Sequence, residues 1–290
     1  MIKIGVALGY FDGVHIGHKQ VVAEAARGTD KIAVFTFTGL PPKMGGFAEN
    51  ITDEPHKEEL LHSLGVSEIL APPFEDIRHL SPEEFVDNII AERMNADVVT
   101  SGADFRFGER GAANADDLAR LCGKRGIEAR QVGTVLDENG VAVSSSLIRE
   151  KLKQGEIAYA NKLLGYDISY TLEVLRGNML GRTLNAPTIN QKLTPGVLSP
   201  KRGVYAGYTR VNGITYPSVT NIGVKPTVGS FTEPLLETHI IGWDGDLYGQ
   251  HITVSLLRFI REEQKFGSLE ELKSQIESDK RNVVSKTSLL

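Results

Sequence analysis

The sequence predicts an α/β domain followed by an antiparallel β-barrel that ends in a helix. In the first half, short apolar stretches alternate with segments of helical periodicity, an order that gives a parallel sheet with right-handed crossovers. From residue 168, short β-rich stretches follow one another with Gly, Pro and Asn between them, until a helical pattern begins at residue 269. We therefore expect one domain at residues 1–165 and a second at residues 166–290.

The composition is that of an ordinary globular chain. The 290 residues are 41% hydrophobic and 24% charged. A net charge of −5 argues against a general affinity for nucleic acid or for an anionic membrane. The single cysteine, Cys122, excludes an internal disulfide, and the sequence shows neither a leader pattern nor an apolar run long enough to span a bilayer. We expect a cytoplasmic protein, and self-association is left open.

In the α/β half, five apolar runs predict strands at residues 2–8, 31–37, 66–70, 96–100 and 128–132. Helical patterns follow the first strand and recur at residues 52–64, 81 to about 94, about 114–123 and 150–164. The helix at residue 81 begins with a capping box of Ser81 and Glu84 around Pro82. Gly155 interrupts the last helical pattern, and residues 39–50, rich in Gly and Pro, predict a loop.

In the second half, strands are expected at residues 168–175, 203–211, 215–220, 237–241 and 250–257. Short antiparallel strands of this kind are typical of a closed barrel. A helix is expected from Leu269 to about Asp279, with Ser268 as its cap and Glu271 as the partner in the capping box.

The turn after the first strand combines glycines, an aspartate and two histidines. These residues are Gly9, Asp12, Gly13, His15, Gly17 and His18. Glycines allow close backbone approach, and a helix N-terminus offers free N–H groups, so the turn is suited to a phosphate. If the helix begins near Gly13 or Val14, the two histidines share one face and donate to phosphate oxygens as negative charge accumulates. The plainer interpretation is a capped helix with two surface histidines, and a zinc site is disfavoured because no obvious ligand set completes it.

A second cluster, S-G-A-D-F-R-F-G at residues 101–108, follows the strand that ends near Thr100. Its aromatic side chains are able to pack against a ring while Arg106 faces a phosphate. Taken alone, the cluster favours a plainer interpretation, in which Phe105 and Phe107 are hydrophobic plugs under a loop and Arg106 is in solvent.

A third cluster, V-S-S-S-L-I-R at residues 143–149, opens a helical pattern. Serines in this place are N-caps by default, which alone would explain Ser144 or Ser145. Serine hydroxyls, helix N–H groups and Arg149 one turn later would also form a second phosphate clamp.

The barrel half contains no P-loop and no protein-kinase motifs. Its polar candidates are G-R-T-L-N-A-P-T-I-N at residues 181–190 and the distant Glu237. Thr188 and Asn190 offer hard oxygen ligands for Mg²⁺, and a carboxylate is able to take the proton from an attacking alcohol. Composition alone favours a turn around Pro187 and a glutamate that faces water.

The three clusters of the first half resemble the signatures of a known family. G-Y-F-D-G-V-H-I-G-H at residues 9–18 is similar to the first signature of the HxGH nucleotidyltransferases, and in its F-D-G-V-H form to the FMN adenylyltransferase module of bacterial bifunctional riboflavin kinase/FAD synthetases. G-A-D-F-R-F-G and S-S-L-I-R resemble later elements of that module. The resemblance implies a Rossmann-like domain in which His15, His18 and Arg149 are catalytic. It also implies nucleotide-binding roles for Gly9, Phe11, Asp12, Gly13, Gly17, Asp104, Phe105, Ser145 and Ser146.

The second half resembles the riboflavin kinase of the same family. G-R-T-L-N-A-P-T-I-N is similar to the signature G-R-x-L-G-F-P-T-A-N, and N-I-G-V-K-P-T-V, L-E-T-H, D-L-Y-G and F-I-R-E-E-Q-K-F follow in the family's order. The resemblance implies that Glu237 is the general base on the riboflavin 5′-hydroxyl and that Thr188 and Asn190 hold Mg²⁺ and ATP. It further places Gly181 and Arg182 in the nucleotide site, and Arg261 and Phe266 beside the flavin.

The resemblance implies an enzyme that acts on small molecules. It would phosphorylate riboflavin with ATP to FMN and adenylylate FMN with ATP to FAD and pyrophosphate, with Mg²⁺ as cofactor. Because Asn185-Ala186 stands where the family has Gly-Phe, the alternative is an adenylyltransferase whose barrel binds flavin with weak or no kinase activity. An adenylyltransferase for another acceptor, pantetheine phosphate or nicotinate mononucleotide, is a further alternative, against which the barrel motifs argue.

Overall fold

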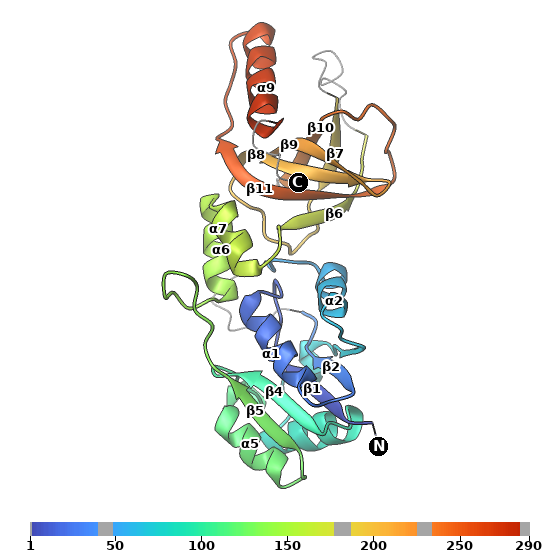
Figure 1. Cartoon of the computed structure of the whole chain (residues 1–290), viewed down its shortest axis with the longest axis vertical. Coiled ribbons are helices and arrows are strands. Elements are labelled where there is room, and N and C mark those ends of the chain that lie inside the picture. The colour runs from blue at the N-terminus through green and yellow to red at the C-terminus, as the bar shows by residue number, and fades with distance from the viewer. Residues whose placement is uncertain (1, 40–48, 177–186, 225–233, 285–290) are drawn as a thin grey trace. The chain divides into compact units, whose positions relative to one another are not determined.

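The computed structural model describes residues 2–39, 49–176, 187–224 and 234–284. The chain divides into two compact units, Met1–Ser145 and Ser146–Leu290 (Figure 1). None of the helices in these described ranges is both long enough and apolar enough to cross a membrane.

The first unit is built on a five-stranded parallel sheet in the order β3-β2-β1-β4-β5. All five expected strands are present, most of them shorter at one end than the apolar runs suggest. They are β1 (Ile4–Leu8), β2 (Lys31–Phe35), β3 (Glu68–Leu70), β4 (Val98–Gly102) and β5 (Glu128–Val132). Because β1 is central, the loop after its carboxyl end lies where open α/β sheets bind ligands.

Helices cover both faces of this sheet, so the predicted α/β layering is confirmed. On one face, α1 (Ile16–Ala26) and α2 (Glu54–Ser63) pack on Ala7 and Val34. On the other face, a helical segment η1 (Phe85–Arg93) and α5 (Ala115–Gly123) pack on Val6 and Leu8. Alternate residues of β1 thus enter two separate hydrophobic clusters. Three shorter elements complete the unit: α3 (Phe74–Ile77), α4 (Pro82–Glu84) and η2 (Glu109–Gly111).

The predicted α-helix from Ser81 to about Met94 is only partly correct. Its capping box is present: the Ser81 hydroxyl accepts a hydrogen bond from the Glu84 N–H at 3.2 Å, and the Glu84 carboxylate accepts one from the Ser81 N–H at 2.8 Å. Beyond α4 the chain continues as a π-helix, which is wider than an α-helix. The buried residues of this segment are Phe85, Val86, Ile89 and Ile90, two adjacent pairs four positions apart, and the wider turn suits that spacing.

The second unit is a nearly closed antiparallel barrel of six strands in the order β6-β11-β8-β9-β10-β7. The strands are β6 (Ser169–Glu173), β7 (Thr188–Lys192), β8 (Gly203–Val211), β9 (Ile214–Val224), β10 (Pro234–Ile240) and β11 (His251–Arg261). The N–H of Leu175 donates to the Asn190 carbonyl at 2.7 Å, a bridge that joins the two edges of the sheet. The predicted barrel is confirmed, but β7 was not among the expected strands.

Among the described residues, three helices precede or follow the barrel strands in the sequence. The first two, α6 (Ser145–Gln154) and α7 (Ile157–Leu164), are separated at Gly155, whose φ is +81°. The last, α9 (Leu269–Val284), contacts β8 and β9 and extends beyond the expected end at Asp279 (Figure 1). Its expected capping box is half present. The Ser268 hydroxyl accepts from the Glu271 N–H, but the Glu271 carboxylate accepts from the N–H of Gly267 instead of that of Ser268.

Candidate active sites

The turn between β1 and α1 has an unusual backbone. Phe11, Gly13 and Val14 have φ values of 56°, 74° and 37°. Positive φ suits glycine but is strained for a β-branched residue such as Val14, and strain of this kind collects at functional sites. The Val14 N–H donates to the Phe11 carbonyl at 3.1 Å, and the buried Asp12 carboxylate accepts from the Ile51 N–H at 2.8 Å. These bonds hold the turn in its strained form.

His15 and His18 lie together at the N-terminus of α1. The expected helix start at Gly13 or Val14 is wrong, because both residues have left-handed backbone, and α1 begins at Ile16 with His15 as its N-cap. The Nδ1 atom of His15 accepts a hydrogen bond from the His18 N–H at 3.3 Å, and the two rings stack with centroids 3.6 Å apart. A Cβ on Gly17 would lie 3.1 Å from the His15 ring, so glycine leaves room for this arrangement.

His15 is buried and His18 is half-buried, and this sets their protonation. Burial lowers the pKa of His15 to about 4. The pKa of His18 falls well below its ordinary 6.5, mainly through burial and further through the charges of His15 and Lys57. Both rings are therefore neutral at pH 7. Because Nδ1 of His15 accepts a bond, its Nε2 carries the hydrogen and is available as a donor.

Lys57 adds a buried positive charge beside this turn. Its side chain is 4% exposed, with Nζ 2.7 Å from the Glu54 carboxylate and 5.1 Å from the centre of the Tyr10 ring. Sequence reasoning did not select Lys57, because a lysine on a helix is normally exposed. The available signal was its spacing of four from Leu61, which is buried on the same helix.

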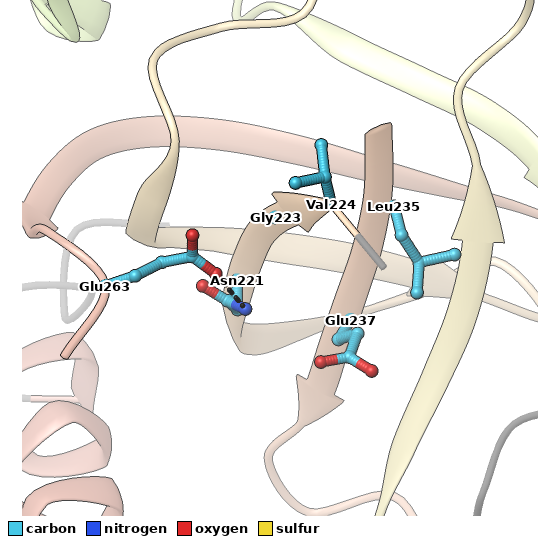
Figure 2. A pocket seen from close by; sticks show the side chains of 6 residues that line it. All are labelled: Asn221, Gly223, Val224, Leu235, Glu237 and Glu263. Atoms are coloured by element: carbon cyan, nitrogen blue, oxygen red, sulfur yellow. Dashed lines mark hydrogen bonds between the residues drawn. The ribbon is translucent and has the colours of Figure 1, made fainter. Parts of the chain in front are cut away.

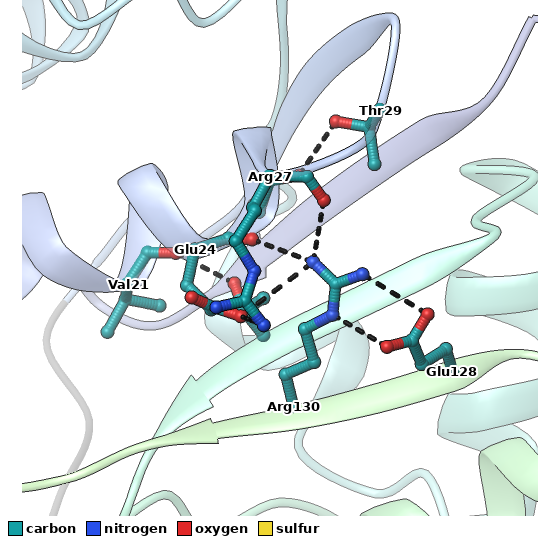
Figure 3. Close-up of polar contacts among 8 residues, drawn as sticks. Val21, Glu24, Arg27, Thr29, Glu128 and Arg130 are labelled. Carbon is teal, nitrogen blue, oxygen red and sulfur yellow. Dashed lines mark hydrogen bonds and ion pairs between the residues drawn. The ribbon is translucent and has the colours of Figure 1, made fainter.

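The other end of α1 is fixed by Arg130 of β5 (Figure 3). Its guanidinium donates to the carbonyls of Glu24 and Arg27 at 3.1 and 2.7 Å, and it also pairs with the Glu128 carboxylate. These carbonyls belong to the last turn of the helix, where intrahelical partners are lacking. The helix that carries the histidines is thus tied to the edge strand of the sheet.

Ser145 joins the third predicted cluster to the first. Its hydroxyl donates to the Asp12 carbonyl at 2.9 Å, so the start of α6 contacts the turn. Ser146 and Arg149 follow within α6, and Arg149 is buried. These two residues belong to the second unit, and their nucleotide roles stay predictions.

The second predicted cluster follows β4, which neighbours β1 in the sheet. Phe107 is buried in the core beside Phe85 and stacks on Phe105, so the hydrophobic plug expected from the plainer interpretation is present for Phe107. Asp104 is exposed at the surface. Within the described ranges, no hydrogen bond or ring contact links Asp104 or Phe105 to the histidines.

In the second unit, strand register brings the predicted kinase residues to one face. Asn190 of β7 lies opposite Glu237 of β10, which in turn lies opposite Asn221 of β9. Thr188 lies opposite His239 on the same face, because residues two apart on a strand point the same way. Leu236 and Thr238 alternate with these residues and are buried. These polar residues of β7, β9 and β10, called the polar row below, therefore lie on the outer face of the barrel.

Glu237 is one of the residues that line a small pocket (Figure 2). Its lining residues are Asn221, Gly223, Val224, Leu235, Glu237 and Glu263. The Asn221 side-chain amide donates to the Glu263 carboxylate at 3.3 Å, and a Cβ on Gly223 would lie 2.5 Å from that carboxylate. Sequence reasoning assigned no roles to Asn221, Gly223 or Glu263, although they fall within the N-I-G and F-I-R-E-E segments.

The two residues predicted to border the flavin lie near α9, and that role stays a prediction. The Arg261 guanidinium pairs with the buried Asp279 of α9, with Nη2 to Oδ2 at 2.8 Å, and lies 5.8 Å from the centre of the Phe266 ring. This pair holds α9 against the barrel. Gly181 and Arg182 lie outside the described residues, as does the Asn185-Ala186 departure.

The oxygen donors of the polar row fit Mg²⁺. Thr188 offers a hydroxyl and Asn190 an amide oxygen, both hard ligands that this ion accepts. In the part of the chain that the structure describes, no cluster of three or more His, Cys, Asp or Glu side chains is arranged to hold a metal ion.

Two family models match this chain, one in each half. An FAD synthetase family model matches residues 2–147, and a riboflavin kinase family model matches residues 164–286. The bifunctional riboflavin kinase/FMN adenylyltransferase of Bacillus subtilis (strain 168) is 33% identical over 97% of this chain and 92% of its own length. The chain belongs to the bifunctional riboflavin kinase/FMN adenylyltransferase family. Residues 148–163 fall between the two family matches, so the domain boundary at residue 165 stays a prediction.

Two further relatives of this bifunctional family member span nearly the whole chain. The bifunctional riboflavin kinase/FMN adenylyltransferase of Escherichia coli (strain K12) is 33% identical over 94% of this chain and 90% of its own length. A solved structure from Streptococcus pneumoniae, described as a macrolide-efflux protein, has a TM-score of 0.87 and 29% identity and covers 97% of this chain and 94% of its own. The fold of both units therefore occurs together in one solved chain.

Proposed function

We propose that this chain phosphorylates riboflavin to FMN in its second unit and adenylylates FMN to FAD in its first, with ATP as the donor in both reactions. The observation that carries the proposal is that each unit holds its own polar site. One is a helix N-terminus capped by stacked histidines, suited to phosphates. The other is a row of oxygen donors around one carboxylate, suited to an alcohol and a metal-bound nucleotide.

In adenylyl transfer, an FMN phosphate oxygen bonds to the α-phosphorus of ATP while the bond from that phosphorus to the β-phosphate oxygen breaks. The products are FAD and pyrophosphate. The attacking oxygen is already ionised, so the site needs no general base and acts by alignment and by stabilising charge. The Nε2–H of His15, His18 and the free N–H groups of α1 would donate to the phosphates. Lys57 supplies positive charge beside them.

The remaining predicted residues of the first site would complete this arrangement. Ser145, bonded to the turn at Asp12, supports a place for its own hydroxyl at the nucleotide. The resemblance gives Ser146 and Arg149 phosphate-binding roles, and Asp104 and Phe105 would border the nucleotide after the neighbouring strand. The strained backbone at Phe11 and Val14 supports a turn shaped for close approach by a ligand.

In the kinase reaction, the riboflavin 5′-oxygen bonds to the γ-phosphorus of ATP, its proton passes to the Glu237 carboxylate, and ADP leaves. Thr188 and Asn190 would hold Mg²⁺, which when bound neutralises charge on the phosphates. Asn221, fixed by Glu263, flanks Glu237 and would orient the substrate hydroxyl. The alternative of a barrel that binds flavin without phosphorylating it stays open, since the Asn185-Ala186 departure on which it rests lies outside the described residues.

The cellular setting is part of the same proposal. We place the protein in the cytoplasm, where ATP is available, because its single cysteine suits a reducing compartment. Its net charge of −5 supports small molecules as partners instead of nucleic acid.

Separation of flavins by chromatography tests the proposal. The purified chain is incubated with ATP, Mg²⁺ and either riboflavin or FMN. We expect riboflavin to give FMN and then FAD, and FMN to give FAD directly. Conversion of FMN with riboflavin unchanged would contradict the kinase assignment, and no change in either flavin would contradict both acceptors.

A further inference from the structure

His239 makes a side-chain bond at the point where the chain enters β7. It lies on β10 two residues after Glu237 and opposite Thr188. Its Nδ1 atom is 2.8 Å from the carbonyl oxygen of Pro187. A carbonyl only accepts hydrogen bonds, so Nδ1 carries the hydrogen and donates it.

Backbone hydrogen bonds between strands alone hold Pro187 poorly. Proline has no N–H group to contribute to a sheet, so its carbonyl is the only backbone group through which a neighbour can bond to it. The backbone pairing of β7 with β10 starts at Thr188. The His239 bond therefore fixes the peptide plane that leads directly into Thr188.

The ring of His239 is partly buried, and the charges of Lys280 and Glu277 on α9 act on it. Burial lowers the pKa of His239. The 2.8 Å bond to the Pro187 carbonyl fixes the Nδ1 side of the ring.

We propose that His239 is a positioning residue of the kinase site, which fixes the Pro187 carbonyl so that the Thr188 hydroxyl and the Asn190 amide face the metal-bound nucleotide. This inference rests on the proposed kinase function. It assigns no contact between His239 and the substrate. Its physical content is that one side-chain hydrogen bond fixes the Pro187 carbonyl directly before the backbone pairing of β7 begins.

Two variants separate the hydrogen bond from the bulk of the ring. His239→Ala removes the donor, and His239→Asn keeps an N–H near the position of Nδ1. Thr253→Val is the matched control, because it removes a cross-strand side-chain bond on the outer face of the same barrel, the 2.8 Å contact between the hydroxyls of Thr171 and Thr253. FMN adenylylation by the first unit is measured in each sample to verify that the chain is folded.

The first readout is hydrogen exchange of the peptide covering residues 187–192, followed by mass spectrometry. The second is the rate of riboflavin phosphorylation as a function of Mg²⁺ concentration. We expect His239→Ala to speed exchange in this peptide, to raise the Mg²⁺ concentration at half-maximal rate and to lower kcat/KM about tenfold, since small displacements at a site cost 10- to 100-fold in rate. His239→Asn should recover most of both losses, and Thr253→Val should show neither.

Each contrary result identifies what has failed. Unchanged exchange and Mg²⁺ dependence in His239→Ala would overturn the role of His239 while the kinase assignment stands. Equal impairment in His239→Ala and His239→Asn would also overturn it, because the ring and not the hydrogen bond would then matter. A wild-type chain that makes no FMN from riboflavin would contradict the proposed function itself, and with it the role given to His239.

Discussion

The two candidate sites differ in how the chain brings their residues together. The histidine site is formed by residues 9–18, a contiguous turn whose backbone is strained at Phe11 and Val14. The Glu237 site is formed by three strands, whose register places Asn190, Glu237 and Asn221 in one row. A local turn keeps its geometry through its own hydrogen bonds, whereas a row across strands keeps it only while the pairing holds.

The two sites also differ in their electrostatics. His15 is buried, His18 is half-buried, and both are neutral beside the buried charge of Lys57. Glu237 is only partly buried on the outer face of the barrel, next to the exposed Glu263. We expect a substitution at one site to change only the activity of that site, because the two sites are formed and held by different parts of the chain.

The largest expected effect is on the kinase. Glu237→Gln removes the proton acceptor and keeps the shape of the side chain, so phosphorylation of riboflavin should fall about 10²- to 10⁴-fold while FMN adenylylation is unchanged. The rates of FMN and FAD formation, measured by chromatography, check both parts. Glu262→Gln is the control, because Glu262 is exposed and pairs with Lys201 at the surface. An unchanged kinase rate in Glu237→Gln would remove Glu237 from the site.

The reciprocal effect is expected in the first unit. His15→Ala removes both a donor and the helix cap, so FMN adenylylation should fall about 10²- to 10³-fold, the usual cost of losing one such donor. Riboflavin phosphorylation in the same sample should not change. His79→Ala, at an exposed histidine of the same unit, is the control. Equal loss of both activities would indicate unfolding and break the comparison between the sites.

Sequence periodicity was sufficient for the layers of the fold, because they depend on patterns repeated over several residues. The five parallel strands, the capping box at Ser81 and the barrel strands follow from such patterns. Two elements, the π-helix and β7, did not follow from periodicity. The π-helix depends on how Phe85 and Ile89 pack on the sheet, and β7 forms because Ile189 and Gln191 face the barrel interior opposite Thr238 and Leu236.

The candidate sites were predictable to different degrees for the same reason. His15 and His18 lie within one motif, so their proximity followed from spacing, although the strained turn shifted the helix start to Ile16. Lys57 and His239 depend on which face of a helix or strand meets its neighbour, and local sequence does not encode that. The roles carried over by resemblance, including those of Arg149 and Phe266, stay predictions.

Low pH should lower the free energy of unfolding of the first unit, because His15 is buried in the folded chain. The pKa of His15 is about 4 in the folded chain and about 6.5 when exposed, so the unfolded state binds the proton first as pH falls. This contribution to stability is complete above pH 6.5 and is lost progressively down to pH 4, by up to about 3 kcal/mol. Urea unfolding at several pH values, with pulsed hydrogen exchange of residues 16–26, measures it. His15→Asn should flatten the decline and His79→Asn should not; an equal decline in all three chains would contradict this assignment.

The smallest effect on activity is expected from a substitution at Gly17, beside the His15 ring. Gly17→Ala places a Cβ 3.1 Å from the His15 ring, which must shift by a few tenths of an ångström, so adenylylation should fall about tenfold without loss of the fold. Gly123→Ala is the matched control, because no atom lies within 4 Å of the added Cβ. Steady-state kinetics with FMN and ATP check the result. A Gly17→Ala enzyme as active as the control would show that the ring position is not critical.

The central claim is that two complete sites in one chain act in sequence. The most direct test mixes two variants, Glu237→Gln and His15→Ala/His18→Ala, and follows FAD formation from riboflavin, ATP and Mg²⁺. We expect neither variant alone to make FAD from riboflavin at an appreciable rate and the mixture to do so, because the FMN released by one is adenylylated by the other. If the mixture makes no more FAD than either variant alone although the wild-type chain makes it, the two sites are not independently complete and the claim is contradicted.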